Sequence, residues 1–395
     1  MNMCDPPRRT MKHKIAFVGV GFVADYYIET LKNHPQLELL GVFDRNKQRA
    51  LQFGSCYSVN LYDSLEELLA DPQVEIVVNL TNPGSHFEVS KASLLADKHL
   101  YSEKPLSMEL SQAKELIQLA SKRGLYISSA PCGLLGETAQ TIVDALENKA
   151  IGQVRAVYAE IDEGPIHQEE PHKWFSKSGA PWPYEDEFQV GCTMEHAGYY
   201  LTWLPAFFGP VKTVTAFARV LIPNKQVRPG EPLEFDTPDF SVACLEFETG
   251  VVARLTCSII APYNHTLRII GDDGVLSIDE CWNYHAPVHI EKYSKMGFRV
   301  EKYPLFRRHE LLKSIVGAGD KEYERTGKKR PFRRYLSHDQ DISRGIAELA
   351  DALEDGRRPK LPADYVLHVN ELVLAIQNST GNNAPYQMTT SFEPL

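Results

Sequence analysis

The sequence predicts an α/β fold: a doubly wound parallel sheet, followed by an α+β domain with a large, mostly antiparallel open sheet. Three observations support this prediction. The chain has 395 residues, which is long for one hydrophobic core and favours two domains. Short apolar runs alternate with helical patterns in the first third. After about residue 150, the pattern changes to successive strands joined by tight turns.

The first third supplies the alternation that a parallel sheet needs, with a helix crossing between consecutive strands. The expected strands are 15–18, 37–43, 75–80, 99–101 and 125–128. The expected helices are 25–33, 65–70, 88–96 and 112–122.

The second half supplies β-rich runs separated by turn residues, such as those at 248–250 and 271–274, which indicate antiparallel pairing. The expected strands are 154–161, 211–221, 240–248, 251–260, 267–270 and 275–278. A loop rich in proline and tryptophan at 162–190 precedes an expected helix at 193–207, and two further helices are expected at 342–353 and 365–377.

These patterns predict a disordered leader at 1–12, a Rossmann dinucleotide-binding domain at 13–131, and an α+β substrate-binding and oligomerisation domain at 132–395. We expect the C-terminal helices to pack back on the first domain. A basic stretch at 307–334 is typical of a solvated loop, with a phosphate or a partner subunit as the alternative.

Composition narrows the class of protein. Hydrophobic residues make up 43% of the chain and charged residues 24%, which is typical of a globular protein. The net charge of −10 disfavours nucleic acid and anionic membranes as partners, and no apolar stretch is long enough to cross a bilayer. Seven scattered cysteines without a Cys-x-x-Cys pair argue against disulfides and structural zinc, and favour a cytoplasmic protein.

The turn Gly19-Val20-Gly21-Phe22-Val23-Ala24 follows the first strand and opens a helix, as in dinucleotide-binding sites. The first glycine permits a tight turn, and the second lets backbone amides approach a pyrophosphate. Asp44 ends the second strand at the offset expected of the acid that binds the ribose hydroxyls, which favours NAD. Arg45 follows and offers a site for a 2′-phosphate, so NADP is the alternative.

Residues 76–106 contain Thr81-Asn82-Pro83 with His86, and later Glu103-Lys104-Pro105. This arrangement closely resembles the glucose–fructose oxidoreductase/inositol dehydrogenase (Gfo/Idh/MocA) family. Residues 133–154 resemble the interdomain helix of that family, and the segments at 343–345 and 367–369 resemble its C-terminal helices. The resemblance implies NAD(P)-dependent hydride transfer at a secondary alcohol of a sugar, sugar derivative or cyclitol. It also implies a homodimer or homotetramer. His167, Glu169, Glu170 and His172 raise the alternative of a metal site, but their spacing matches no helical zinc motif, so no metal is expected.

The resemblance implies Lys104 as the catalytic lysine, with Pro105 in a cis peptide bond as one option. In the tyrosine-containing branch of the family, a tyrosine four residues after an acid completes the site. Glu195 and Tyr199 match that spacing, and four residues place both on one face of a helix. We expect Tyr199 to carry the proton, Lys104 to lower the pKa of Tyr199, and Glu195 to orient Lys104 or the substrate. His196 is the competing base.

The expected cofactor-binding residues are Gly19, Gly21, Phe22, Val23, Asp44, Arg45, Thr81, Asn82, Pro83, His86, Glu103 and Lys104. The expected substrate-binding residues are Lys104, Trp174, Trp182, Glu195, His196 and Tyr199. Aromatic faces suit sugar rings, whereas ordinary loop packing is the alternative for the two tryptophans. Two other functions stay open: a redox-assisted, NAD-dependent glycosidase that oxidises, eliminates and reduces, and a non-catalytic dinucleotide-binding regulator.

Overall fold

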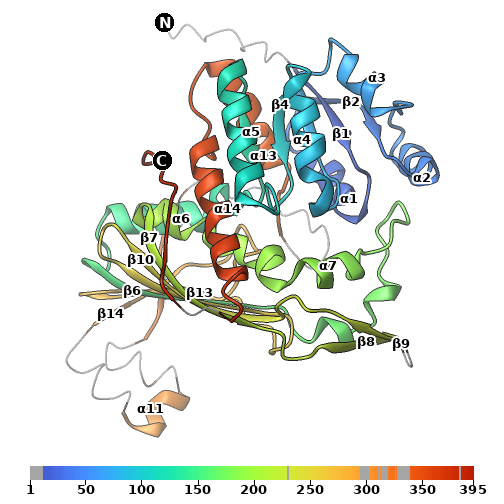
Figure 1. Ribbon diagram of the computed structural model, residues 1–395. Coiled ribbons are helices and arrows are strands. Elements are labelled where there is room, and N and C mark those ends of the chain that lie inside the picture. Colours follow the sequence, from blue (N-terminus) through green and yellow to red (C-terminus); the bar gives the residue numbers. More distant parts are fainter. Residues whose placement is uncertain are drawn as a thin grey trace, which may run out of the picture.

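A computed structural model describes residues 12–228, 231–293, 302–309, 312, 319–324, 326, 339–381 and 384–395. Figure 1 shows two sheets stacked end to end, with helices of the second half lying between them. The 1–12 leader, apart from residue 12, and most of the basic stretch at 307–334 lie outside the described residues.

The first sheet is parallel throughout and has the strand order β2-β1-β3-β4-β5. Its strands are β1 (His13–Val18), β2 (Leu37–Phe43), β3 (Ile76–Asn79), β4 (His99–Ser102) and β5 (Ile127–Ser129). The strand order reverses between β1 and β3, so the crevice beyond the carboxyl ends of these two strands is the expected ligand site of a doubly wound sheet.

Helices cover both faces of this sheet: α1 (Phe22–Leu31), α2 (Lys47–Tyr57), α3 (Leu65–Ala70), α4 (His86–Leu95) and α5 (Leu110–Arg123). One more helix arrives from the far end of the chain. Ile346 and Leu349 of α13 (Arg344–Asp355) are buried in one apolar cluster with Phe17 and Tyr27. The first core is therefore completed by residues more than 300 positions away.

The second sheet has nine strands in the order β15-β14-β13-β12-β6-β11-β10-β7-β16, and only the β6–β11 pair is parallel. Its strands are β6 (Val154–Asp162), β7 (Val211–Arg219), β10 (Phe240–Phe247), β11 (Val252–Ser258), β12 (Leu267–Gly271), β13 (Gly274–Ile278), β14 (His289–Lys292), β15 (Lys321–Glu322) and β16 (Tyr386–Gln387). A separate hairpin pairs β8 (Asn224–Arg228) with β9 (Glu231–Glu234). The predicted fold class is confirmed.

The helices between the two sheets are α6 (Glu137–Glu147), α7 (Tyr184–Val190) and α14 (Ala363–Gln377). The single helix expected at 193–207 is wrong. The chain forms a π-helical turn at Thr193–Ala197, then α8 (Gly198–Leu201) and α9 (Leu204–Phe208). Pro205 lacks the amide that a continuous helix needs, which explains why α9 is a separate short helix. The helix α7 also lies inside the stretch predicted as loop, and α2 was not predicted.

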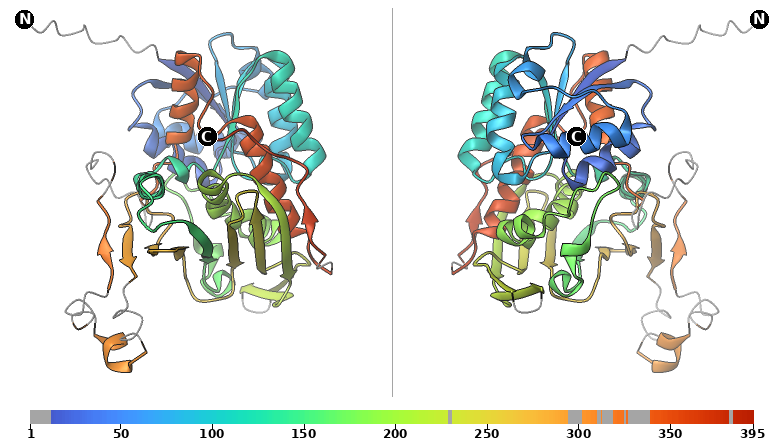
Figure 2. Two further views of the ribbon diagram at one scale, coloured as in Figure 1. Left: turned by 90° about the vertical axis from the view of Figure 1, so that its left-hand side faces the viewer. Right: turned by 90° about the vertical axis from the view of Figure 1, so that its right-hand side faces the viewer.

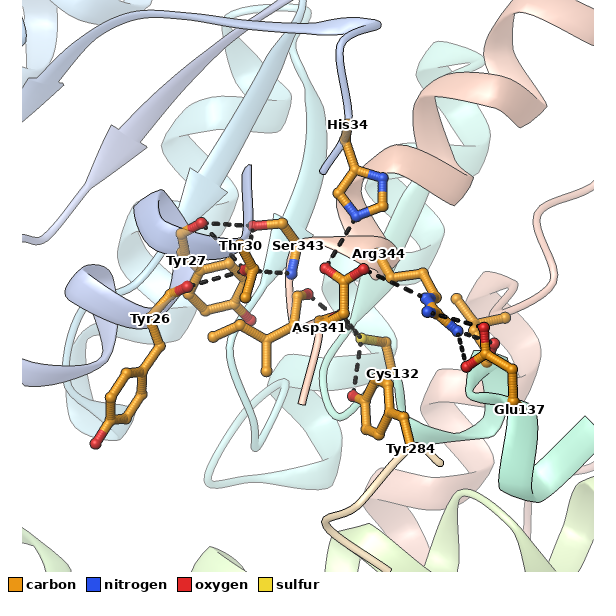
Figure 3. A network of polar contacts seen from close by, with 12 residues as sticks. Tyr26, Tyr27, Thr30, His34, Cys132, Glu137, Tyr284, Asp341, Ser343 and Arg344 are labelled. Carbon is orange, nitrogen blue, oxygen red and sulfur yellow. Dashed lines mark hydrogen bonds and ion pairs between the residues drawn. The ribbon is translucent and has the colours of Figure 1, made fainter. Parts of the chain in front are cut away.

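Polar contacts join the first domain to the start of α13 (Figure 3). Ser343 accepts a hydrogen bond from Thr30 of α1 at 3.0 Å and donates one to the Tyr27 carbonyl at 2.7 Å. Arg344 next to it pairs with Glu137 at the start of α6, at 2.9 Å. Because these residues are largely buried, the junction fixes α1 and α6 relative to α13. None of the described helices has the length and apolar character needed to cross a membrane.

Candidate active site

The glycine turn between β1 and α1 has the shape that a dinucleotide needs. Gly19 has a φ of +91°, and a Cβ there would lie 2.7 Å from the carbonyl oxygen of Leu80, so only glycine fits. A Cβ on Gly21 would meet nothing within 4 Å. The space in front of Gly21 is thus open where α1 points its free amides, which suits a pyrophosphate.

Asp44 ends β2 beside this turn and is 9% exposed. One of its carboxylate oxygens accepts a hydrogen bond from the Val20 amide at 2.9 Å, and the other accepts one from the Asn46 amide at 2.8 Å. The carboxylate therefore holds the glycine turn in place. Each oxygen keeps a second lone pair, so ribose hydroxyls still fit as donors. Arg45 beside it is exposed.

The loop after β3 is built around two buried polar side chains. Asn79 accepts hydrogen bonds from the Thr81 hydroxyl at 2.7 Å and the Thr81 amide at 3.2 Å. The ring of His86 lies between two carbonyl oxygens, that of Pro105 at 2.6 Å and that of Thr81 at 2.8 Å. His86 is fully buried and joins the loop after β3 to the Lys104–Pro105 turn, and a cofactor contact stays a prediction for it.

The Glu103-Lys104-Pro105 turn contains a cis peptide bond between Lys104 and Pro105, and the glutamate side chain holds the turn in place. One oxygen of Glu103 accepts a hydrogen bond from Tyr27 of α1 at 2.6 Å, and the other accepts one from the Lys104 amide at 2.9 Å. Glu103 therefore fixes the turn that presents Lys104. Both of its oxygens have protein partners, so the structure gives it a structural part in addition to the cofactor contact expected of it.

Lys104 forms an ion pair with Glu195, and its side chain remains 20% exposed. Burial lowers the pKa of Lys104, but attraction to Glu195, then to Tyr199 and other acids, outweighs burial and raises that pKa overall. Burial raises the pKa of Glu195 to about 7, against the opposing effect of the Lys104 charge. Lys104 consequently stays protonated in a largely buried site.

Tyr199 lies in the field of the same lysine. Burial raises the pKa of Tyr199, the Lys104 charge lowers it, and nearby carboxylates such as Glu103 raise it again. The pKa of Tyr199 is raised overall. Lys104 does lower this pKa, as expected, but the effect of burial is larger. The ring packs edge-on against Trp282, with centroids 5.2 Å apart. Tyr199 is therefore a protonated phenol beside a cation.

Glu195 and His196 point into different surroundings, although they are adjacent in the π-helical turn. One ring nitrogen of His196 lies 2.5 Å from a Glu187 oxygen, and the other lies 3.1 Å from a Glu163 oxygen. That same oxygen of Glu163 lies 3.2 Å from His265, which also pairs with Glu280 at 2.9 Å. Both nitrogens of His196 thus face carboxylates.

This arrangement moves the pKa values of His196 and Glu163 apart. Burial would lower the pKa of His196, but Glu163 and Glu187 raise it to about 10. Burial would raise the pKa of Glu163, but His196 and His265 lower it to about 2. His196 is a fixed cation at neutral pH and is poorly suited to act as a base.

Trp174 and Trp182 pack against one another at a tilt of 50° in the segment before α7, with ring centroids 5.0 Å apart. Both are partly buried and pack against the second core. A strand-like bridge between Phe175 and Pro181 holds the segment as a small hairpin. The two rings are thus brought together by loop packing, and substrate contact stays a prediction for them.

Glu163, Glu187 and Trp282 surround the site but were not predicted. They come from the end of β6, from α7 and from the chain after β13. No spacing in the sequence links these three positions to Lys104. They become neighbours through the strand pairing of the second sheet, for example β6 with β11 and β12, and through the packing of α7 on the π-helical turn.

Comparisons with known proteins identify the family. Residues 13–130 match the model described as an oxidoreductase family with an NAD-binding Rossmann fold, and residues 139–277 match the GFO/IDH/MocA C-terminal domain. The trans-1,2-dihydrobenzene-1,2-diol dehydrogenase of Bos taurus is 24% identical over 270 residues, 67% of this chain and 74% of the relative.

Two solved structures have the same fold. An NAD-binding oxidoreductase from Klebsiella pneumoniae superposes with a TM-score of 0.77 at 17% identity, covering 96% of this chain and all of the other. A 3-ketoreductase from Actinomadura kijaniata, in complex with TDP-benzene and NADP, gives 0.68 at 20% identity, covering 93% of this chain and 98% of the other. The chain belongs to the GFO/IDH/MocA family of NAD(P)-binding oxidoreductases, as its motifs predicted.

Proposed function

We propose that this oxidoreductase transfers hydride between a nicotinamide and a secondary alcohol or ketone of a sugar, sugar derivative or cyclitol. One observation carries the proposal. The retained ammonium of Lys104 lies on a turn that Glu103 and His86 tie to α1 and to the loop after β3, and the protonated Tyr199 of α8 lies in the field of that ammonium. Hydride transfer to or from a C–OH carbon requires a proton donor or acceptor at that oxygen.

The site residues divide the work as follows. When bound, NAD(P) supplies the hydride acceptor or donor. The ammonium of Lys104 stabilises negative charge on the substrate oxygen. Tyr199 holds the proton at its phenol oxygen and donates it as a ketone is reduced, because its raised pKa keeps it protonated at neutral pH. Glu195 keeps Lys104 charged and holds its ammonium in an ion pair.

The relatives support the substrate class without fixing it. The bovine relative is named for a diol on a six-membered carbon ring, and the Actinomadura neighbour is named a 3-ketoreductase bound to a nucleotide ligand. Both names refer to oxidation or reduction at oxygen-bearing carbons. We extend that chemistry to this chain because Lys104, Glu195 and Tyr199 are clustered in its cleft.

For the cofactor we propose NAD over NADP, since Asp44 lies where a ribose-binding acid is expected. The outer face of the second sheet exposes Tyr158, Phe217 and Val252. We propose that this face joins copies of the chain, and light scattering should then give a dimer or tetramer mass. A monomer mass would contradict that assembly.

The experiment that tests the function is a screen of the purified protein with NAD, NADP and their reduced forms. A panel of sugars, cyclitols and their keto forms is followed by nicotinamide absorbance, with products identified by mass spectrometry. We expect cofactor turnover with at least one member of the panel. Glycoside cleavage without net cofactor turnover would instead support the glycosidase, and dinucleotide binding with no reaction would support the regulator.

A further inference from the structure

A short hairpin of the second domain, residues 174–182, reaches the first domain, and we call it the clasp. A strand-like bridge joins Phe175 to Pro181, and the tryptophan pair described above lies at its base, against the second core. At its tip, the Ser176 carbonyl oxygen accepts a hydrogen bond from the Gly179 amide at 3.0 Å. Figure 1 shows this part of the chain rising beside α1 and α2 before it descends into α7. The clasp therefore has a defined backbone of its own where it meets the first domain.

The tip of the clasp is bound to α1 through a buried carboxylate. Ser178 donates hydrogen bonds from its amide and its hydroxyl to the two oxygens of Asp25, at 2.7 and 2.8 Å. Asp25 is 3% exposed and accepts a third hydrogen bond from Tyr57 of α2 at 2.7 Å. Lys177 pairs with Glu29 one turn further along α1 at 2.6 Å, with most of the lysine side chain exposed. Since hydrogen bonds to a buried charged acceptor are stronger than exposed ion pairs, the Ser178 contacts dominate this junction.

The chain that carries the clasp is anchored on both sides of the crevice where a dinucleotide is expected. Asp25 belongs to the first turn of α1, whose free amides face the open space in front of Gly21. Beyond the clasp, Asp186 of α7 accepts a hydrogen bond from Asn82 in the loop after β3. Since the crevice lies beyond the carboxyl ends of β1 and β3, a dinucleotide bound there lies between these two contacts. The segment 178–186 therefore crosses the entrance to the pyrophosphate site.

We infer that the clasp is a gate, which must release α1 each time a dinucleotide enters or leaves the site. The contacts of Ser178 and Lys177 described above are made with the protein itself, so their strength sets how often the clasp opens. A gate of this kind slows entry and exit by the same factor and leaves the affinity unchanged. The inference rests on dinucleotide binding alone, so a protein that binds NADH but converts no sugar or cyclitol would leave it intact.

The test is the exchange of NADH, followed by stopped-flow fluorescence with no substrate present. Ser178→Ala combined with Lys177→Ala removes both side-chain contacts with α1. We expect association and dissociation each to become about tenfold faster, with the dissociation constant within about twofold of the wild type, because losing a hydrogen bond to a carboxylate changes an equilibrium by about that factor. The matched control is Lys173→Ala, which should leave both rates unchanged, since Lys173 is an exposed lysine whose described ion pair is with Glu170 of the same domain.

Two outcomes of this experiment would overturn the inference. Unchanged rates in the double variant would show that the clasp is a fixed part of the fold. Faster dissociation with unchanged association, and therefore weaker binding, would make the clasp part of the surface that holds the cofactor instead of a gate.

A second measurement fixes the clasp in its closed position. The thiol of Cys56, an exposed residue of α2, lies 4.0 Å from the Lys177 carbonyl oxygen, so Lys177→Cys places a second thiol beside it. Oxidation of the two thiols by diamide, with the disulfide verified by mass spectrometry, should slow both rates about tenfold or more relative to the reduced form. A reductant should restore them, and the same variant with Cys56→Ser should not respond. Exchange of NADH at the reduced-form rate in the disulfide-linked protein would contradict the gate.

Discussion

Two buried charge clusters meet at the π-helical turn of Thr193–Ala197, one around Lys104 and one around His196, and they differ in what their charges face. Lys104 has one close carboxylate, Glu195, and keeps a fifth of its side chain exposed. His196 has carboxylates at both ring nitrogens and is 9% exposed in its side chain. We call the Lys104–Glu195 group the open cluster, and His196 with Glu163 and Glu187 the closed cluster. Glu195 and His196 are adjacent in sequence, yet they belong to different clusters.

The difference indicates how a catalytic charge is distinguished from a structural one. In the closed cluster, Glu163 and His196 form an ion pair, and their pKa values move apart to about 2 and about 10. In the open cluster, the pKa of Glu195 moves toward neutrality, to about 7, and the Lys104 side chain beside it stays 20% exposed. A charge that is both retained and accessible is available to a substrate.

The strongest test of this contrast is to remove the accessible cation. Lys104→Met should lower the rate of hydride transfer about 10³-fold or more, because the developing charge on the substrate oxygen loses its stabilisation. Calorimetry should show that dinucleotide binding is retained. The matched control is Lys98→Met: Lys98 is also buried, but it donates only to the carbonyl oxygens of Asp71 and Val74. A comparable rate loss in Lys98→Met would contradict the assignment of this effect to the Lys104 ammonium.

The next largest effect is expected from the phenol. Tyr199→Phe should lower the steady-state rate about 10²-fold, because the ring still packs on Trp282 while the proton is lost. Tyr200→Phe is the control, since Tyr200 is a buried neighbour whose hydroxyl donates to the carbonyl oxygen of His265. An unchanged rate for Tyr199→Phe would return His196 to consideration as the proton carrier.

A substitution in the closed cluster should lower the free energy of unfolding rather than the reaction rate. His196→Gln leaves Glu163 and Glu187 without their shared cation, which costs about 3–5 kcal/mol in comparable buried pairs. We expect urea unfolding to show that loss, and the folded fraction to keep its rate within about tenfold. A rate loss as large as that of Tyr199→Phe, at unchanged stability, would contradict the division between the clusters.

The smallest expected effect is in pH dependence. The pKa of folded His196 is raised from 6.5 to about 10, so its stabilisation is present below pH 6.5 and is lost as the pH rises toward 10. The pKa of folded Glu163 is lowered from 4.5 to about 2, so its contribution is lost as the pH falls through that range. Urea unfolding across pH 6.5–10 should show a shallower decline for His196→Gln than for the wild type. Parallel declines would show that His196 does not carry this dependence.

Much of the first domain could be predicted because its signals are local. Gly19, Gly21 and Asp44 act through backbone geometry within one strand–turn–helix unit. The exception is α2, where Gly54 interrupts the helical pattern. A Cβ at Gly54 would lie 2.9 Å from the Leu61 side chain, so tertiary packing requires glycine inside a helix that sequence propensity disfavours.

The candidate site could be predicted only in part. Lys104, Glu195 and Tyr199 were found by motif and spacing, and the structure brings the polar groups of all three together. The surroundings of His196 could not be predicted, because Glu163 and Glu187 come from β6 and α7, which become neighbours only through the second sheet and its covering helices. The π-helical turn that separates Glu195 from His196 has no propensity signal of its own.

The central claim is that Lys104 and Tyr199, and not His196, serve the hydride-transfer step. The most direct test is a single-turnover measurement of nicotinamide absorbance with a carbonyl substrate from the panel, comparing Tyr199→Phe and His196→Gln with the wild type. Ring-deuterated NAD(P)H in the same experiment reports whether hydride transfer limits the observed rate. The account predicts a slow, isotope-sensitive phase for Tyr199→Phe and a near-normal phase for His196→Gln. The reverse order would contradict it.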